Sequence, residues 1–172
     1  SWVRRFGTPH DDFLRAMVVV DDAIYVCGAT YGAVVGANQG DLDAFISKFT
    51  LSGSEIWSYQ LGSNDTDECS AIVVGKIDDN SGSRPVYIAG STAGDLFGST
   101  TFEGVQYRYV ARFSDTPLDG LKLVEGTQKS TIQTTSTAGI ALSSKYLYVA
   151  TNTYDAGKEL DAQAGCTIEL FH

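Results

Sequence analysis

The most constraining feature of this chain is an internal repeat, because a repeated sequence unit predicts a repeated structural unit. Tyr25 opens the segment YVCGATYG, and Tyr87 opens the closely similar segment YIAGSTAG. A fainter copy, YVATNTY, begins at Tyr148. We therefore expect three copies of one supersecondary unit.

Each copy of this motif belongs to a series of short segments with the character of β-strands. The segments are rich in β-branched and aromatic residues, and Gly, Asp and Ser separate them, as is typical of strands joined by turns. The first segments, at residues 13–20, 69–74 and 137–142, are almost continuously apolar, which predicts burial on both faces. The second segments are residues 24–28, 86–90 and 147–151, and the third are residues 43–49, 107–113 and 165–171.

A fourth segment in each unit is marked by a glycine that follows a bulky strand. Residues 2–6, 57–61 and 121–125 precede Gly7, Gly62 and Gly126. The repeat units then cover about residues 7–62, 63–126 and 127–172. Residues 2–6 become the outer strand of a preceding or closing unit, which gives twelve strands in total. We expect residues 2–6 to pair with another chain or with a segment outside this sequence rather than with residues 166–171.

Composition limits the class of protein and its partners. The 172 residues suit one domain, and 43% apolar with 19% charged residues suits a packed core. A formal net charge of −9 disfavours binding to nucleic acid and to anionic membrane surfaces. No apolar run reaches the length of a transmembrane helix, so we expect no membrane insertion.

One set of residues occurs in a fixed order between residues 2 and 57, namely Trp2, Gly7, Asp12, Tyr25, Gly28, Thr30, Asp43, Ala44, Phe45, Lys48, Gly53 and Trp57. This pattern resembles the SBBP family, the β-propeller repeats of secreted and surface proteins. The resemblance implies an all-β fold of about three four-stranded antiparallel blades in an extracellular or cell-surface setting. Because closed propellers usually have four or more blades, it also implies that the chain is part of a larger ring.

The three cysteines fit neither a disulfide-rich scaffold nor a zinc site. Cys27 and Cys69 lie on neighbouring predicted strands of adjacent units, so they are the expected pair if a disulfide forms, with Cys166 free. Three reduced core cysteines are the alternative. Asn64 begins an Asn-Asp-Thr sequon, which predicts N-glycosylation if the protein is secreted.

Acidic residues gather in several predicted turns. Two pairs alternate as in calcium loops, Asp41 with Asp43 and Asp65 with Asp67, but neither continues into a complete calcium-binding pattern. Asp12 and Asp67 hold equivalent places in two repeats, which favours capping of turn N–H groups. Two histidines and three scattered cysteines are too few for a transition-metal site, so we expect no metal and no cofactor.

Motifs for catalysis are weak in this sequence. Residues 90–94 resemble a G-x-S-x-G nucleophile elbow with Thr92 at the centre, but no predicted helix follows, and the same turn recurs at residues 28–32. His10 lies in a predicted turn, where a solvated structural histidine is the simpler interpretation. We therefore assign no catalytic residue.

The repeated aromatic residues allow two interpretations. Packing between units is favoured, and a sugar-binding surface is the alternative. These residues are Tyr25, Tyr87 and Tyr148, with Trp2, Trp57 and Phe113.

The leading functional hypothesis is a non-enzymatic structural or protein-binding module of an extracellular assembly. Its expected partners are other protein subunits or further blades of the same protein. A carbohydrate-binding module is the alternative. An enzyme whose active residues lie in blades outside this sequence is third.

Overall fold

The computed structural model describes the chain except for residues 22, 100–104, 131–133, 155–164 and 172. The described residues contain strands and turns but no helix, and so no helix that could span a membrane. Their eleven strands are β1 (Asp12–Val20), β2 (Ala23–Thr30), β3 (Asp43–Thr50), β4 (Glu55–Leu61), β5 (Asp67–Val74), β6 (Arg84–Thr92), β7 (Tyr107–Thr116), β8 (Gly120–Ser130), β9 (Thr134–Leu142), β10 (Leu147–Tyr154) and β11 (Gly165–Phe171).

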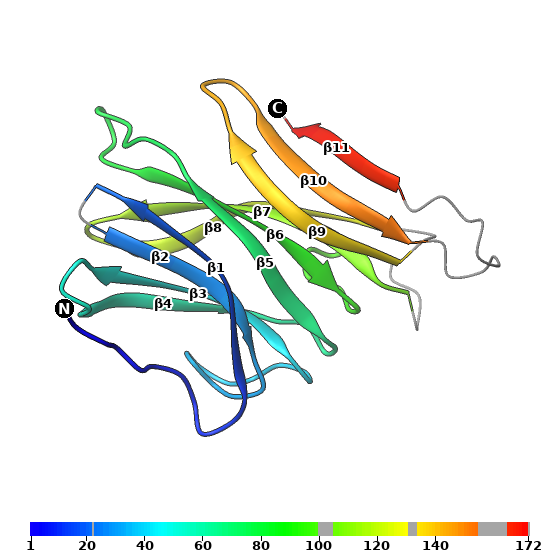
Figure 1. Cartoon of the computed structure of the whole chain (residues 1–172), viewed down its shortest axis with the longest axis horizontal. Coiled ribbons are helices and arrows are strands. Elements are labelled where there is room, and N and C mark those ends of the chain that lie inside the picture. The colour runs from blue at the N-terminus through cyan, green and yellow to red at the C-terminus, as the bar shows by residue number, and fades with distance from the viewer. Residues whose placement is uncertain (22, 100–104, 131–133, 155–164, 172) are drawn as a thin grey trace.

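Strands that follow one another in sequence pair into three antiparallel sheets, as Figure 1 shows. Sheet 1 has the order β1-β2-β3-β4, sheet 2 has the order β5-β6-β7-β8, and sheet 3 has the order β9-β10-β11. The first strand of sheet 2, β5, contacts β1 on one side and β9 on the other. Sheet 2 is therefore the middle layer, and sheets 1 and 3 cover its two faces.

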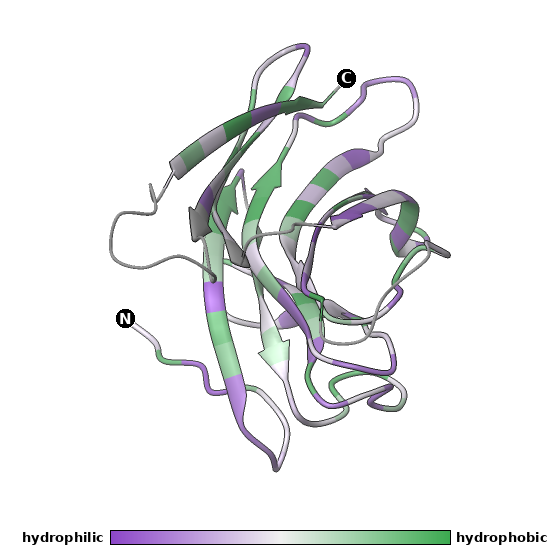
Figure 2. Cartoon of the chain, turned by 90° about the vertical axis from the view of Figure 1, so that its right-hand side faces the viewer, coloured by the Kyte–Doolittle hydropathy of each residue, from purple (hydrophilic) through white to green (hydrophobic). Residues whose placement is uncertain are grey.

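Hydrophobic residues lie mainly between these layers, and hydropathy alternates along several strands in Figure 2. The largest cluster joins sheets 1 and 2 and includes Tyr25, Ile46, Ile88 and Phe113. A second cluster, around Ala89 and Val149, joins sheets 2 and 3. Alternate side chains of the middle strands point to opposite faces, so β2 and β6 are buried on both sides.

The first strand of every sheet contains a β-bulge at the equivalent position. The register shifts between residues 14 and 16 in β1, between residues 69 and 71 in β5, and between residues 137 and 139 in β9. A β-carbon added to Gly28 would lie 1.9 Å from Phe13 O, and one added to Gly90 would lie 1.8 Å from Glu68 O. The glycine of the repeated Gly-x-Thr motif is therefore explained by the close approach of the neighbouring backbone at this bulge, which leaves no room for a side chain.

Residues 2–6 do not form the strand that the sequence predicts. They run along the outer face of sheet 1, where Phe6 stacks on Phe49 at a ring-centroid distance of 4.8 Å. A strand needs a neighbouring edge with which to share its backbone hydrogen bonds, and this face offers side chains instead. Within the described residues β11 pairs only with β10, so no ladder joins residues 2–6 to residues 166–171.

The end of sheet 2 also differs from the predicted repeat boundary. β8 continues to Ser130, so residue 126 lies inside that strand rather than in the turn after it. The side chain of Gln128 accepts a hydrogen bond from the Leu96 N–H and donates one to Gly94 O. The side chain of Gln60 makes the same two bonds in sheet 1, with the Val34 N–H and Gly32 O. Gln128 is therefore the structural counterpart of Gln60, and the alignment of Gly126 with Gly62 is wrong.

Candidate functional site

The interface between sheets 1 and 2 is centred on one buried carboxylate. Asp115, at the end of β7, accepts hydrogen bonds from Tyr25 Oη at 2.6 Å, Lys48 Nζ at 2.7 Å and Trp57 Nε1 at 3.0 Å. The three donors come from three strands of sheet 1. Lys48 Nζ also lies 5.1 Å from the centre of the Tyr25 ring. Asp115 therefore fixes the position of sheet 2 against sheet 1.

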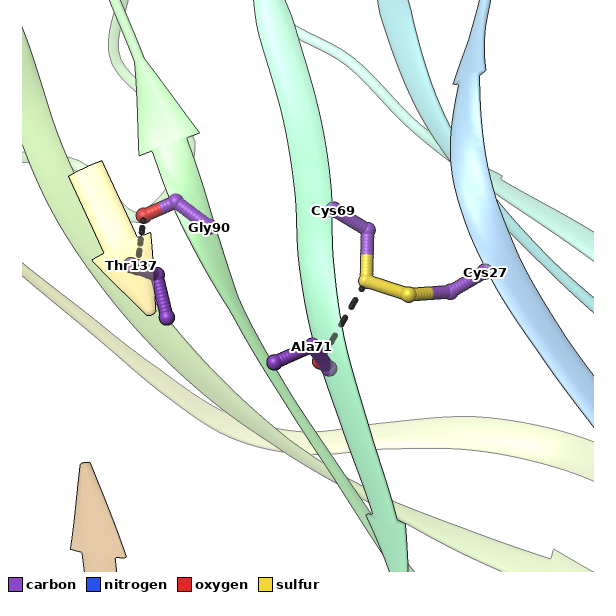
Figure 3. Close-up of a disulfide and its surroundings, with 5 residues drawn as sticks. All are labelled: Cys27, Cys69, Ala71, Gly90 and Thr137. Carbon is purple, nitrogen blue, oxygen red and sulfur yellow. Dashed lines mark hydrogen bonds between the residues drawn. A yellow bond between two sulfur atoms is a disulfide. The ribbon is translucent and has the colours of Figure 1, made fainter. Parts of the chain in front are cut away.

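A disulfide crosses the same interface, as Figure 3 shows. The structure joins Cys27 of β2 to Cys69 of β5, with their Cα atoms 5.8 Å apart. Both cysteines are completely buried. Cys166 on β11 is free and exposed. This covalent link, the Asp115 cluster and the apolar core together make sheets 1 and 2 one unit.

The contact between sheets 2 and 3 uses the same positions of the repeat. The registers place Tyr25 opposite Lys48, Tyr87 opposite Arg112 and Tyr148 opposite Leu170, which identifies these as equivalent pairs. Tyr87 and Val110 pack against Val149 and other residues of sheet 3, as their counterparts in sheet 1 pack against sheet 2. Each sheet thus has one face that receives the preceding sheet and one that receives the next.

Sheet 1 leaves its receiving face largely open. In sheet 2 this face begins with Cys69 and Ile72 of β5, which are 0% and 8% exposed under sheet 1. The equivalent residues of β1, counted from the common bulge, are Leu14 and Met17, which are 54% and 63% exposed. We call Leu14, Met17 and Val19 the open face of sheet 1. Leu14 and Met17 of this face are exposed, although the equivalent residues of sheet 2 are buried.

Beside the open face, residues 2–6 cover part of the same side of sheet 1. Phe6 packs onto a cluster formed by Val26, Phe45 and Phe49. The Trp2 indole lies against Gly53, and its Nε1 donates to Leu51 O at 2.9 Å. The segment therefore lies on the face of sheet 1 that looks away from sheet 2.

Sheet 3 has a matching open face on its far side. Ile168 is 73% exposed, whereas its counterpart in sheet 1, Ile46, is 1% exposed. Tyr148 and Leu170 are also exposed there. We call Tyr148, Ile168 and Leu170 the open face of sheet 3. β11, the edge strand, has no second neighbour among the described residues.

A groove of about 1290 Å³ lies between sheets 2 and 3. Its walls include aromatic residues together with an exposed ion pair between Arg112 and Glu125. The register places Glu125 opposite Arg112 as Trp57 is opposite Lys48. The groove therefore has a carboxylate at the position where the other interface has an indole.

The repeated acidic residues cap turns. Asp12 Oδ2 accepts the Thr8 N–H at 2.7 Å, and Asp67 Oδ2 accepts the Ser63 N–H at 2.5 Å. Burial raises the pKa of the Asp67 carboxyl, an effect that its hydrogen bonds partly oppose. Asp43 likewise accepts the Gln39 N–H at 2.9 Å. No group of three or more metal-ligating acidic, His or Cys side chains occurs in the part of the chain that the structure describes.

The other residues considered for chemistry stay apart. Thr92 Oγ1 accepts a hydrogen bond from the Gly94 N–H, and Thr30 Oγ1 accepts one from the Gly32 N–H. Both threonines therefore stabilise the repeated turn. His10 is exposed, and its N–H binds Thr8 Oγ1. His172 lies outside the described residues. Asn64 is exposed in the turn before β5, where a glycan would have access.

The aromatic residues divide between the two interpretations. Tyr25 and Phe113 are buried between sheets, whereas Tyr87 lines the groove and Tyr148 is exposed. Asp115, Gln60 and Gln128 were not predicted from the sequence. No acidic residue stands at the position of Asp115 in sheet 1, where Leu51 is found, but the recurrence of Gln before Leu61 and before Lys129 could have indicated the role of the two glutamines.

Comparison with known proteins adds no family to this description. No protein-family model matches the chain, and no curated protein matches it.

Proposed function

We propose that this chain is a non-enzymatic structural and protein-binding module that acts by stacking β-sheets. In this account the three sheets are consecutive blades of a propeller-like array, and the open faces of sheets 1 and 3 receive further protein. The observation that carries the proposal is the exposure of Leu14 and Met17, whose counterparts in sheet 2, Cys69 and Ile72, are buried under sheet 1. Leaving these apolar side chains in water forgoes roughly 1.5–3 kcal/mol for each large residue.

An extracellular or cell-surface location belongs to the same proposal. The Cys27–Cys69 disulfide is completely buried and lies between two sheets. Structural disulfides persist mainly in oxidising compartments, which supports this location. The exposed Asn64 sequon is compatible with it.

Oxidation of Met17 tests the proposal, because Met17 is the single methionine of the chain. Hydrogen peroxide should oxidise Met17 rapidly in the isolated chain and slowly in the assembly purified from the protein's source, since a sheet on the open face would shield it. The assembly unfolded in denaturant provides the fully reactive control. Equal oxidation rates in the isolated chain and the assembly would contradict the proposal.

A carbohydrate-binding function is the second candidate, and the groove between sheets 2 and 3 supports it. Tyr87 and Tyr146 supply aromatic surface there, and Arg112 and Glu125 supply polar groups, a combination that suits a saccharide. A glycan array tests it. Binding that disappears in Glu125→Gln would support the sugar-binding function, and no binding to any glycan would contradict it.

A further inference from the structure

We propose that two copies of this chain join head to tail, with residues 2–6 of one copy forming the fourth strand of sheet 3 in the other. This deepens the proposed function, on which it rests, by naming the partner as a second copy. Among the described residues, sheet 3 has three strands where sheets 1 and 2 have four, and residues 2–6 lie on sheet 1 without pairing in a sheet. Residues 2–6 therefore supply a segment that could pair, and β11 supplies a free edge among the described residues.

The position of Trp2 supports this pairing. Trp57, in the fourth strand of sheet 1, donates its indole N–H to Asp115 of sheet 2, two residues beyond Phe113. Trp2 donates its indole N–H to the backbone carbonyl of Leu51, in the turn between β3 and β4 and two residues beyond Phe49. The position of Trp2 on sheet 1 therefore corresponds to the position of Trp57, in the fourth strand of sheet 1, on sheet 2. Residues 2–6 already lie where the fourth strand of a preceding sheet would be.

The repeat also specifies the register of the added strand. In sheet 1, Trp57 is opposite Lys48 and Leu61 is opposite Ala44. The counterparts of Lys48 and Ala44 on β11 are Leu170 and Cys166. With Trp2 in the place of Trp57 and Phe6 in the place of Leu61, Trp2 comes opposite Leu170 and Phe6 opposite Cys166.

The same docking brings the two open faces together. The open face of sheet 3 would cover Leu14 and Met17 of the other copy, as sheet 1 covers Cys69 and Ile72 of sheet 2. The interface is heterologous, because different surfaces of the two copies meet, and two such contacts would close a ring of six sheets. Each copy carries a net charge of −9, so salt should strengthen the association by screening repulsion.

The native mass of the full chain tests the proposal through surface substitutions. The unaltered chain should reach at least twice its 18.4 kDa as concentration rises, and more readily in added salt. Met17→Lys and Ile168→Lys change exposed residues on the two open faces, and each alone should weaken association at least tenfold. Leu118→Lys, at an exposed turn residue outside both faces, is the matched control and should have no effect.

Mixing the two variants separates a head-to-tail contact from a symmetric one. The Met17→Lys chain keeps its sheet 3 face and the Ile168→Lys chain keeps its sheet 1 face, so an equimolar mixture should form a heterodimer through one intact contact. Loss of association in only one variant would mean that identical faces meet and would overturn the proposal. A native chain that stays at 18.4 kDa at all concentrations would also overturn it.

The predicted register has its own readout. A Phe6→Cys chain should form an intermolecular disulfide with Cys166 under mild oxidation, and the added substitution Cys166→Ser should remove it. Associated chains that form no such disulfide would contradict the register. Monomeric chains combined with protection of Met17 in the native assembly would refute self-association while leaving the proposed function standing.

Discussion

Trp2 and Trp57 lie against the third hairpin of two successive sheets. A β-carbon added to Gly53 would lie 3.0 Å from Trp2 Cε3, and one added to Gly120 would lie 3.9 Å from Trp57 Cδ1. Both glycines occupy hairpin turns with positive φ, at 85° and 68°. Each tryptophan thus lies against the third hairpin of the sheet that follows it, which indicates one rule of stacking along the chain.

Asp115 should be the polar group on which the contact between sheets 1 and 2 depends most. Asp115→Ala removes the acceptor of the partly buried Lys48 ammonium and one hydrogen-bond partner of Tyr25 Oη, so we expect a loss of about 3 kcal/mol in the free energy of unfolding. Urea denaturation measures it. Asp119→Ala, at an exposed carboxylate, is the control and should change stability by less than about 0.5 kcal/mol. Equal effects of the two substitutions would refute this role of Asp115.

The Cys27–Cys69 disulfide should stabilise the fold by constraining the unfolded chain. The two cysteines are 42 residues apart, for which the loop-entropy relation gives about 4 kcal/mol. The double substitution Cys27→Ala and Cys69→Ala should lower the free energy of unfolding by about that amount, whereas Cys166→Ser should not. If reductant leaves the unfolding curve of the native chain unchanged, this prediction is wrong.

Asp67 should make stability fall with rising pH. Burial raises the pKa of its carboxyl above the ordinary 3.8, so its contribution is fully present below that value and is lost as the pH rises through the folded-state pKa. The free energy of unfolding of the native chain, relative to Asp67→Asn, should therefore decrease from about pH 3 to about pH 7.

Asp78 provides the comparison of opposite sign. Hydrogen bonds from the Ser81 N–H and hydroxyl lower the pKa of this exposed carboxyl, so its contribution is present above the ordinary 3.8 and is lost as the pH falls through the folded-state pKa. Relative to Asp78→Asn, the native chain should lose stability as the pH falls. Parallel pH curves for the Asp67 and Asp78 comparisons would contradict one of the two assignments, and the sign of the common slope would show which.

Gln128 should hold the loop after β6 in place. Gln128→Leu leaves the Leu96 N–H without its acceptor and removes one of the two donors to the Gly94 carbonyl, which keeps its hydrogen bond from Thr92 Oγ1, so we expect a cost of about 1–3 kcal/mol. Hydrogen exchange should show faster exchange of the Leu96 amide in this variant. Gln39→Leu, at an exposed side chain, should leave that amide unchanged. An unaltered exchange rate in Gln128→Leu would show that the loop does not need this bridge.

The strands could be read from the sequence because each carries its own pattern. The equivalent tyrosines Tyr25, Tyr87 and Tyr148 indeed lie on the second strand of their sheets. The antiparallel pairing of β3 with β4 and of β7 with β8 follows from the short turns that join them. All-β architecture in three sheets was therefore predictable.

Contacts that depend on a single copy were not predictable. Asp115 lies near the end of β7, and only the fold brings it to Tyr25, 90 residues earlier. The predicted boundary at the end of sheet 2 is wrong because Gly126, like the turn glycine Gly62, follows a bulky segment. Gln128, the counterpart of Gln60, identifies the correct alignment. Residues 2–6 have the composition of a strand, but a strand also requires a neighbouring edge.

The most direct test of the account is an experimental structure of the assembly that the protein forms in its native source. Stacking of sheets predicts a β-sheet packed on Leu14, Met17 and Val19, with residues 2–6 hydrogen-bonded into a strand of that sheet. The account would be contradicted if these side chains faced solvent in the assembly while the partner bound elsewhere.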